Sequence, residues 1–248
     1  GWSGVEVAAA GVVITALVGY ATGRQVPPAP PMIEDQRVDY NIWRSSINLI
    51  RNTTRHRQVF LAIIAISFFW TVGTILFIQF PPLAKNVLFA SKEVASLFLV
   101  MFSVGIAIGS VTINALLKGT VSARYSPASV IAMGVFIAAF HFVCKSWPAH
   151  TGTQLMDTGQ FIAEPLAIPL LACLLFIAIA GGMFVVPLYA FLTTVVDKSE
   201  TARTIAANNI VNSGAMVGGS ILAVGLSAAG VAIIDQLLLG AAMCSISA

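Results

Sequence analysis

The 248-residue chain is strongly apolar: 58% of its residues are hydrophobic, 9% are charged, and the mean hydropathy is +0.91. A soluble globular domain carries about 25% charged residues, so this chain has too few to cover a surface that faces water. The composition excludes a soluble protein and predicts an integral membrane protein.

Seven apolar stretches approach or exceed the length of about 20 residues that a helix needs to cross a bilayer. They are too long for barrel strands and show no alternation of polar and apolar residues, so we expect an all-α polytopic membrane protein. The stretches cover 4–20, 58–80, 93–117, 127–145, 165–191, 204–226 and 231–248.

A basic segment, 21–57, separates the first stretch from the other six and contains the sequence PPAPP. We expect 21–39 to be extended, because it is rich in proline and poor in apolar residues. Residues 40–57 alternate Ile, Trp and Leu with Arg, which predicts an amphipathic helix on the inner leaflet. A basic linker that only sets topology is the alternative.

The basic residues also predict the topology. Segment 21–57 and the predicted loops 118–126 and 192–203 hold ten of the 13 Lys and Arg residues. The positive-inside rule places these three segments in the cytoplasm. We therefore expect a helix of a first half (1–20), a cytoplasmic central linker (21–57) and the second six-helix bundle (58–248) of a twelve-helix transporter. A natural seven-helix protein is the alternative.

Three asparagines form the strongest polar group at membrane depth. Asn208 and Asn212 are four residues apart and share a helix face, and Asn209 is next to it. They could line a substrate pathway, form hydrogen bonds between helices, or be solvated at the interface. Arg203, near the start of the same stretch, and Arg124 are candidates for contact with headgroup phosphate or ordinary anchors at the membrane surface.

Other polar residues in the stretches are weaker candidates. Gln79 and Asn114 are possible pathway residues, but both are near segment ends, where solvent would satisfy them. Glu6 and Asp235 are carboxylates within apolar stretches and are therefore candidates for ion coupling. Each is about one turn from an outer boundary, so plain solvation is the alternative.

Small residues and one proline indicate close helix packing or a kink. Spacing of four residues between small side chains allows two helix backbones to approach closely, and a proline removes one helical hydrogen bond. The residues concerned are Gly105, Gly109, Gly181, Gly182, Pro187, Gly214 and Gly218. The pattern does not separate static packing from surfaces that slide or rock.

The sequence contains no pattern typical of an enzyme or a metal site. The three cysteines have no CxxC spacing, the three histidines are scattered, and catalytic motifs such as GxSxG, HExxH and the P-loop are absent. The basic residues follow topology, so nucleic-acid binding is not expected either. We expect no cofactor and no enzymatic activity in this chain.

Several short segments carry a family resemblance. They are Pro187-Leu188-Tyr189-Ala190, Ala202-Arg203, Ile205-Ala206-Ala207-Asn208-Asn209-Ile210 with Asn212, and the loop from Lys118-Gly119 to Ser122-Ala123-Arg124. In these segments the chain resembles the bacterial lysophospholipid transporters of the major facilitator superfamily. It is most similar to forms fused to acyltransferase and acyl-ACP synthetase modules.

The resemblance implies a carrier that moves lysophospholipids to the inner leaflet of the bacterial inner membrane for re-acylation. Asn208, Asn209 and Asn212 would bond the headgroup, and the partners would be membrane lipids and an acyltransferase, fused or separate. The acyltransferase modules and five helices of the first half are not in this sequence, which is a departure from the family pattern. The rival hypotheses are a drug or macrolide exporter of the same superfamily and a non-transporting membrane domain of a fused acyltransferase.

Overall fold

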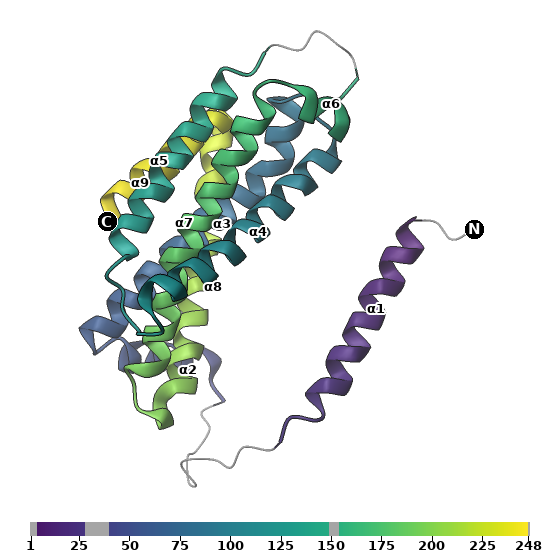
Figure 1. The fold of residues 1–248 in the computed structure, drawn as a ribbon. Helices are drawn as coiled ribbons and strands as arrows, with labels where there is room; N and C mark the ends of the chain where they lie inside the picture. Colours follow the sequence, from purple (N-terminus) through teal and green to yellow (C-terminus); the bar gives the residue numbers. More distant parts are fainter. Residues whose placement is uncertain (1–3, 28–39, 149–153, 248) are drawn as a thin grey trace. The chain divides into compact units, whose positions relative to one another are not determined.

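The computed structural model describes residues 4–27, 40–148 and 154–247 and divides the chain into two compact units, 1–38 and 39–248. The first unit contains α1 (Gly4–Gly23), a 20-residue apolar helix (Figure 1). The part of the predicted linker at 28–39, which includes most of the PPAPP sequence, lies outside the described residues.

The second unit is helical, as the hydropathy pattern predicts (Figure 1). Its elements are α2 (Ile42–Thr53), α3 (Arg57–Asn86), α4 (Lys92–Leu117), α5 (Ser126–Lys145), α6 (Thr158–Ala163), α7 (Ala167–Thr194), α8 (Lys198–Ala228) and α9 (Ile233–Ser247). Within the described ranges, six helices of the chain are long and apolar enough to cross a membrane. The seventh predicted span, α9, is apolar but has only 15 residues.

Two helix boundaries differ from those predicted. The prediction of a loop over 192–203 is wrong: α8 begins at Lys198, and Glu200 in its first turn complements the positive helix N-terminus. The second predicted span ends at 80, but α3 continues through Pro81 and Pro82 to Asn86. Each proline removes only one backbone N–H donor, so the helical hydrogen bonds of the residues that follow can still form up to the helix end.

The short helix α6 was not predicted, although the sequence carries a signal for it. The Asp157 carboxylate accepts a hydrogen bond from the Gln160 backbone N–H, and the Gln160 side chain accepts one from the Asp157 N–H. This reciprocal capping box satisfies two donors that a helix start leaves unpaired.

Helix α7 is the central element of the second unit, because it contacts α3, α4, α5, α6 and α8. Its contact with α4 is made backbone to backbone. A Cβ atom at Gly105 would lie 2.5 Å from Ala178 Cβ, and one at Gly182 would lie 2.6 Å from the Ile106 carbonyl oxygen. Only glycine fits at these two positions, so the glycines let α4 and α7 approach closely.

The helices alternate in direction, which gathers the basic residues at one end of the second unit. There α3, α5 and α8 begin, and α4, α7 and α9 end (Figure 1). We call this the basic end, because it holds Arg55, Arg57, Lys118, Arg124, Lys198 and Arg203.

We predict that Gly109→Ala destabilises the protein by about 1–3 kcal/mol or more. The added Cβ would overlap the Ile179 carbonyl oxygen of α7, and backbone atoms cannot move aside as a flexible side chain would. Unfolding of the purified protein in mixed detergent micelles measures the change in free energy.

The matched control is Gly214→Ala in α8, where no atom lies within 4 Å of an added Cβ. Since alanine is a better helix former, this variant should be as stable as the wild type or up to about 1 kcal/mol more stable. Equal stability of the two variants would contradict the backbone contact.

Candidate functional site

Four side chains from three helices form a chain of hydrogen bonds inside the second unit. Ser67 Oγ on α3 donates to Asn212 Oδ1 on α8 over 2.6 Å. The Asn212 amide nitrogen donates to the Tyr189 hydroxyl on α7 over 3.4 Å, and Trp70 Nε1 on α3 donates to the same hydroxyl over 2.8 Å. We call Ser67, Trp70, Tyr189 and Asn212 the polar cluster.

The cluster forms because polar positions on α3 and α8 fall on the faces that the two helices turn to each other. Ser67 and Trp70 are three residues apart, and Asn208 and Asn212 are four apart, so each pair shares a helix face. The contact continues at Gly219, where a Cβ would lie 2.6 Å from Thr71 Cγ2.

Burial separates the cluster into an inner and an outer part. Ser67 and Asn212 are buried, with exposed fractions of 4% and 6%. Trp70 and Tyr189 are half-buried, and their apolar rings pack against the core. Aromatic residues of this kind bury a large apolar body and keep a polar tip available. Trp70 already donates its single N–H to Tyr189, so the outer part offers a ligand the Tyr189 hydroxyl and the faces of the two rings.

Asn208 lies one turn from Asn212 and is completely buried. Its amide nitrogen donates to Asn209 Oδ1 over a long 3.4 Å, and its own Oδ1 has no hydrogen-bond partner among the described residues. A buried acceptor without a partner costs about 1–3 kcal/mol. This oxygen can accept a hydrogen bond from a ligand or from a neighbouring segment.

The chemistry of the site is that of neutral hydrogen bonding. The polar cluster contains hydroxyl, indole and amide groups and no Lys, Arg, Asp or Glu. Among the described residues there is no group of three His, Cys, Asp or Glu side chains that could hold a metal ion. The arrangement can bind and orient a polar group but offers no activated nucleophile.

The structure places Gln79 in a second buried network. Its amide nitrogen donates to Gln236 Oε1 on α9 over 2.5 Å, and Gln236 donates to Ser227 Oγ and to the Val231 carbonyl oxygen, each over 3.0 Å. Gln79 is nine residues beyond Trp70 on α3, or about 13 Å along the helix. It bonds to another helix and is 4% exposed, so interfacial solvation does not explain it.

Two other predicted pathway residues of the second unit do not join the polar cluster, and the two candidates for ion coupling lie on α9 and α1. Asn209 is exposed beside Asn208, and Asn114 is exposed near the end of α4. Asp235 is exposed in the first turn of α9. Glu6 belongs to α1 in the first unit.

The two arginines lie at the basic end. Arg203 is half-exposed and lies 3.9 Å from the Glu200 carboxylate, a surface pair of the kind that contributes little. Arg124 is exposed, donates to the Tyr125 hydroxyl over 2.6 Å and stands over the Tyr125 ring.

The predicted packing residues fall into two groups. Gly105, Gly109 and Gly182 lie at the α4–α7 contact, and a Cβ at Gly181 would lie 2.8 Å from Phe69 Cε2. At Gly214 and Gly218 an added Cβ would meet nothing within 4 Å. Pro187 is buried in α7, which stays helical to Thr194.

Sequence reasoning did not identify Ser67 and Trp70 as site residues, and it used Tyr189 only as part of a family motif. A signal was present on α3, because Ser67 and Trp70 are three residues apart in a mainly apolar stretch and so share a helix face. The pattern could not show that their partners are on α7 and α8.

We predict that Ser67 and Asn212 are energetically coupled. A double-mutant cycle with Ser67→Ala and Asn212→Ala should give a coupling energy of about 0.6 kcal/mol, with an upper bound of about 1.7 kcal/mol. The readout is the free energy of unfolding in mixed micelles. The control cycle pairs Ser67→Ala with Asn209→Ala, since Asn209 is exposed and has no bond to Ser67. Equal coupling in the two cycles would count against the hydrogen bond.

The comparison with known proteins identifies the family. A family model described as the Major Facilitator Superfamily matches residues 1–220, which is most of the chain. No curated protein and no solved structure matches the chain. Together with the apolar helices, the match shows a multi-pass membrane protein of a transporter family. The chain therefore belongs to the major facilitator superfamily of secondary transporters.

Proposed function

We propose that this secondary transporter moves lysophospholipids across a bacterial inner membrane, where an acyltransferase, fused or separate, restores the missing chain. One observation carries the proposal. Two of the segments that resemble lysophospholipid transporters, 187–190 and 205–212, lie on the consecutive helices α7 and α8 and meet in the polar cluster. Tyr189 from the first and Asn212 from the second share a hydrogen bond.

The chemistry of the substrate supports this assignment. A lysophospholipid has one acyl chain, which can stay in lipid, and a polar head, which needs hydrogen bonds while it crosses. Tyr189 supplies a half-buried hydroxyl, and Asn208 Oδ1 is an acceptor without a partner in the described part of the chain. Donors on an ethanolamine or glycerol head would satisfy that oxygen.

The arrangement in the membrane follows from charge. The positive-inside rule places the basic end and the linker 21–57 in the cytoplasm. Helix α2 exposes Ile42, Trp43 and Ile47 and carries Arg44 and Arg51. Such a helix suits the inner leaflet, with apolar side chains among the acyl chains and arginines near anionic headgroups.

A second candidate is export of neutral drug-like amphiphiles. The observation in its favour is that the polar cluster contains no cationic side chain for a phosphate group. Neutral donors and aromatic rings would serve many amphiphiles about equally well.

We predict that spheroplasts with the full-length protein take up lysophosphatidylethanolamine faster than spheroplasts without it. The assay follows radiolabelled lipid and its conversion to the diacyl form. Lack of uptake together with reduced accumulation of a macrolide would contradict our proposal and favour the exporter. Absence of both activities would favour a non-transporting membrane domain.

We also predict that Asn208→Leu and Asn212→Leu each lower this uptake by about two- to tenfold, which corresponds to the loss of one or two neutral hydrogen bonds. Ser103→Leu on α4 is the matched control, because Ser103 is exposed and, among the described residues, bonds only to the Leu99 carbonyl oxygen of its own helix. Protein level in the membrane is measured for all three. Wild-type uptake by both asparagine variants would remove the asparagines from the pathway, and loss of folded protein would assign them to helix packing.

A further inference from the structure

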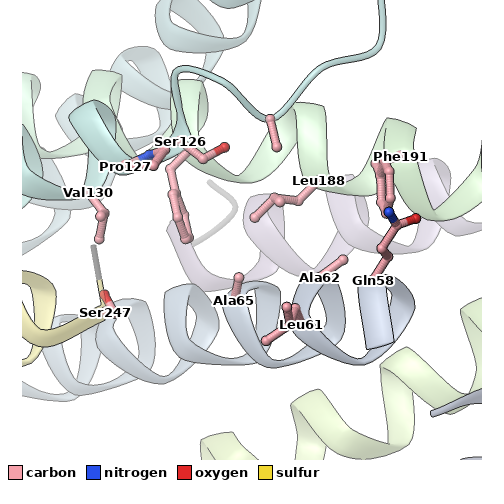
Figure 2. A pocket seen from close by; sticks show the side chains of 12 residues that line it. Gln58, Leu61, Ala62, Ala65, Ser126, Pro127, Val130, Leu188, Phe191 and Ser247 are labelled. Carbon is pink, nitrogen blue, oxygen red and sulfur yellow. The ribbon is translucent and has the colours of Figure 1, made fainter. Parts of the chain in front are cut away.

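A separate cavity of about 410 Å³ lies at the basic end of the second unit. Figure 2 shows Leu61, Ala62 and Ala65 of α3 along one wall, facing residues of α5 and α7 that include Val130 and Leu188. None of the four residues of the polar cluster lines it. Its volume is within the range of about 300–1,000 Å³ typical of small-molecule sites.

The cavity exists because small side chains point into it. Ala62 and Ala65 are three residues apart on α3 and end at Cβ, whereas neighbouring Leu61 fills its position. The facing walls are apolar, with Phe184 and Phe191 from α7 among them. A space with such walls suits a hydrocarbon chain.

Three polar residues, Gln58, Ser126 and Ser247, interrupt the apolar walls. Ser126 begins α5, is 5% exposed and lines the cavity (Figure 2). Its Oγ has no hydrogen-bond partner among the described residues. A buried hydroxyl without a partner costs about 1–3 kcal/mol, so an acceptor on a ligand would be stabilised there. Ser126 is also at the N-terminus of a 20-residue helix, which favours a negatively charged acceptor.

No charged side chain lines the cavity, although Asp197 and Glu200 line a neighbouring pocket that shares Gln58 with it. The walls of the cavity come mainly from 58–65, 123–130 and 184–191. The first two lie within 40–92 and 94–156, which contain Lys and Arg but no Asp or Glu. An oxygen-rich, anionic or zwitterionic head at the Ser126 end is therefore not repelled by carboxylates of these two segments.

We propose that this cavity binds a single-chain amphiphile, with the chain between α3, α5 and α7 and with Ser126 Oγ donating to a head oxygen. The site is distinct from the polar cluster and does not rest on the substrate proposed above. Lysophospholipids and fatty acids share the required chemistry: one hydrocarbon chain and one oxygen-bearing head.

Photolabelling of the purified full chain in phosphatidylcholine nanodiscs tests this site. The probes are a fatty acid and a lysophosphatidylethanolamine, each with a diazirine in the acyl chain, and a diazirine alkane without a head. We expect the headed probes to label peptides from 58–65, 126–130 and 184–191 in competition with the unlabelled compound. Labelling by one headed probe alone would support the site and identify the head as a carboxylate or a phosphodiester. Labelling elsewhere, or equally strong labelling by the alkane, would overturn the proposal.

Two variants test separately how the hydrocarbon chain and the head of the probe contribute to binding. Ala65→Leu should fill the cavity and lower labelling of these peptides by about tenfold or more without loss of stability. Ser126→Ala should weaken binding of the headed probe about tenfold and leave alkane labelling unchanged. The matched control is Ala107→Leu, at an exposed position of α4.

Wild-type labelling of Ala65→Leu would overturn the site, and wild-type affinity of Ser126→Ala would overturn the head contact. Should Ala65→Leu unfold, Ser126→Ala decides alone, because it removes a single oxygen atom. The labelling experiment does not measure transport. A failure of lysophospholipid uptake would therefore contradict the proposed function without contradicting the proposed binding in this cavity.

Discussion

The direct backbone contact between α4 and α7 is the constraint on which the second unit depends. Lipid tails are as apolar as leucine side chains, so helices in a bilayer are held together by close packing and hydrogen bonds. Gly105, Gly109 and Gly182 provide the packing, because α4 and α7 meet where each lacks a side chain. This contact fixes α7, and α7 in turn contacts α3, α5, α6 and α8. The position of Tyr189, and with it the geometry of the polar cluster, follows from the placement of α7.

Hydrogen bonds align α3 with its neighbours at two levels. Ser67 bonds to Asn212 near the middle of the helices, and Gln79 bonds to Gln236 on α9 further along α3. Between the two, Gly219 leaves room for Thr71. Such bonds contribute about half a kilocalorie per mole each in a membrane, so they select one rotation and register of the helices more than they add stability. A rotated α3 or α8 would leave these amides buried without partners.

Hydropathy and charge predicted the elements of the fold far better than the contacts of the site. The apolar stretches located α1, α3–α5 and α7–α9, because the cost of burying polar groups in lipid leaves few alternatives. Residue periodicity placed Asn208 and Asn212 on one face but could not name Ser67 or Tyr189 as partners, since these lie on other helices. The glycine motifs show the same limit. The pairs Gly105/Gly109 and Gly214/Gly218 have identical spacing, yet only the first meets another helix in the described residues. Spacing shows that a close approach is possible, and the surrounding helices decide where it occurs.

Helix α7 divides the interior into two chemical environments. Leu188 lines the apolar cavity with Ala62 and Ala65 of α3, and Tyr189 bonds to Trp70 and Asn212 in the polar cluster. Consecutive helical residues point about 100° apart, so two adjacent positions on one rigid helix serve the two environments. Helix α3 also contributes to both environments, because Ala65 lines the cavity and Ser67 belongs to the polar cluster. The pair α3 and α7 is where this chain brings an apolar cavity and neutral hydrogen-bonding groups within one short stretch of each helix.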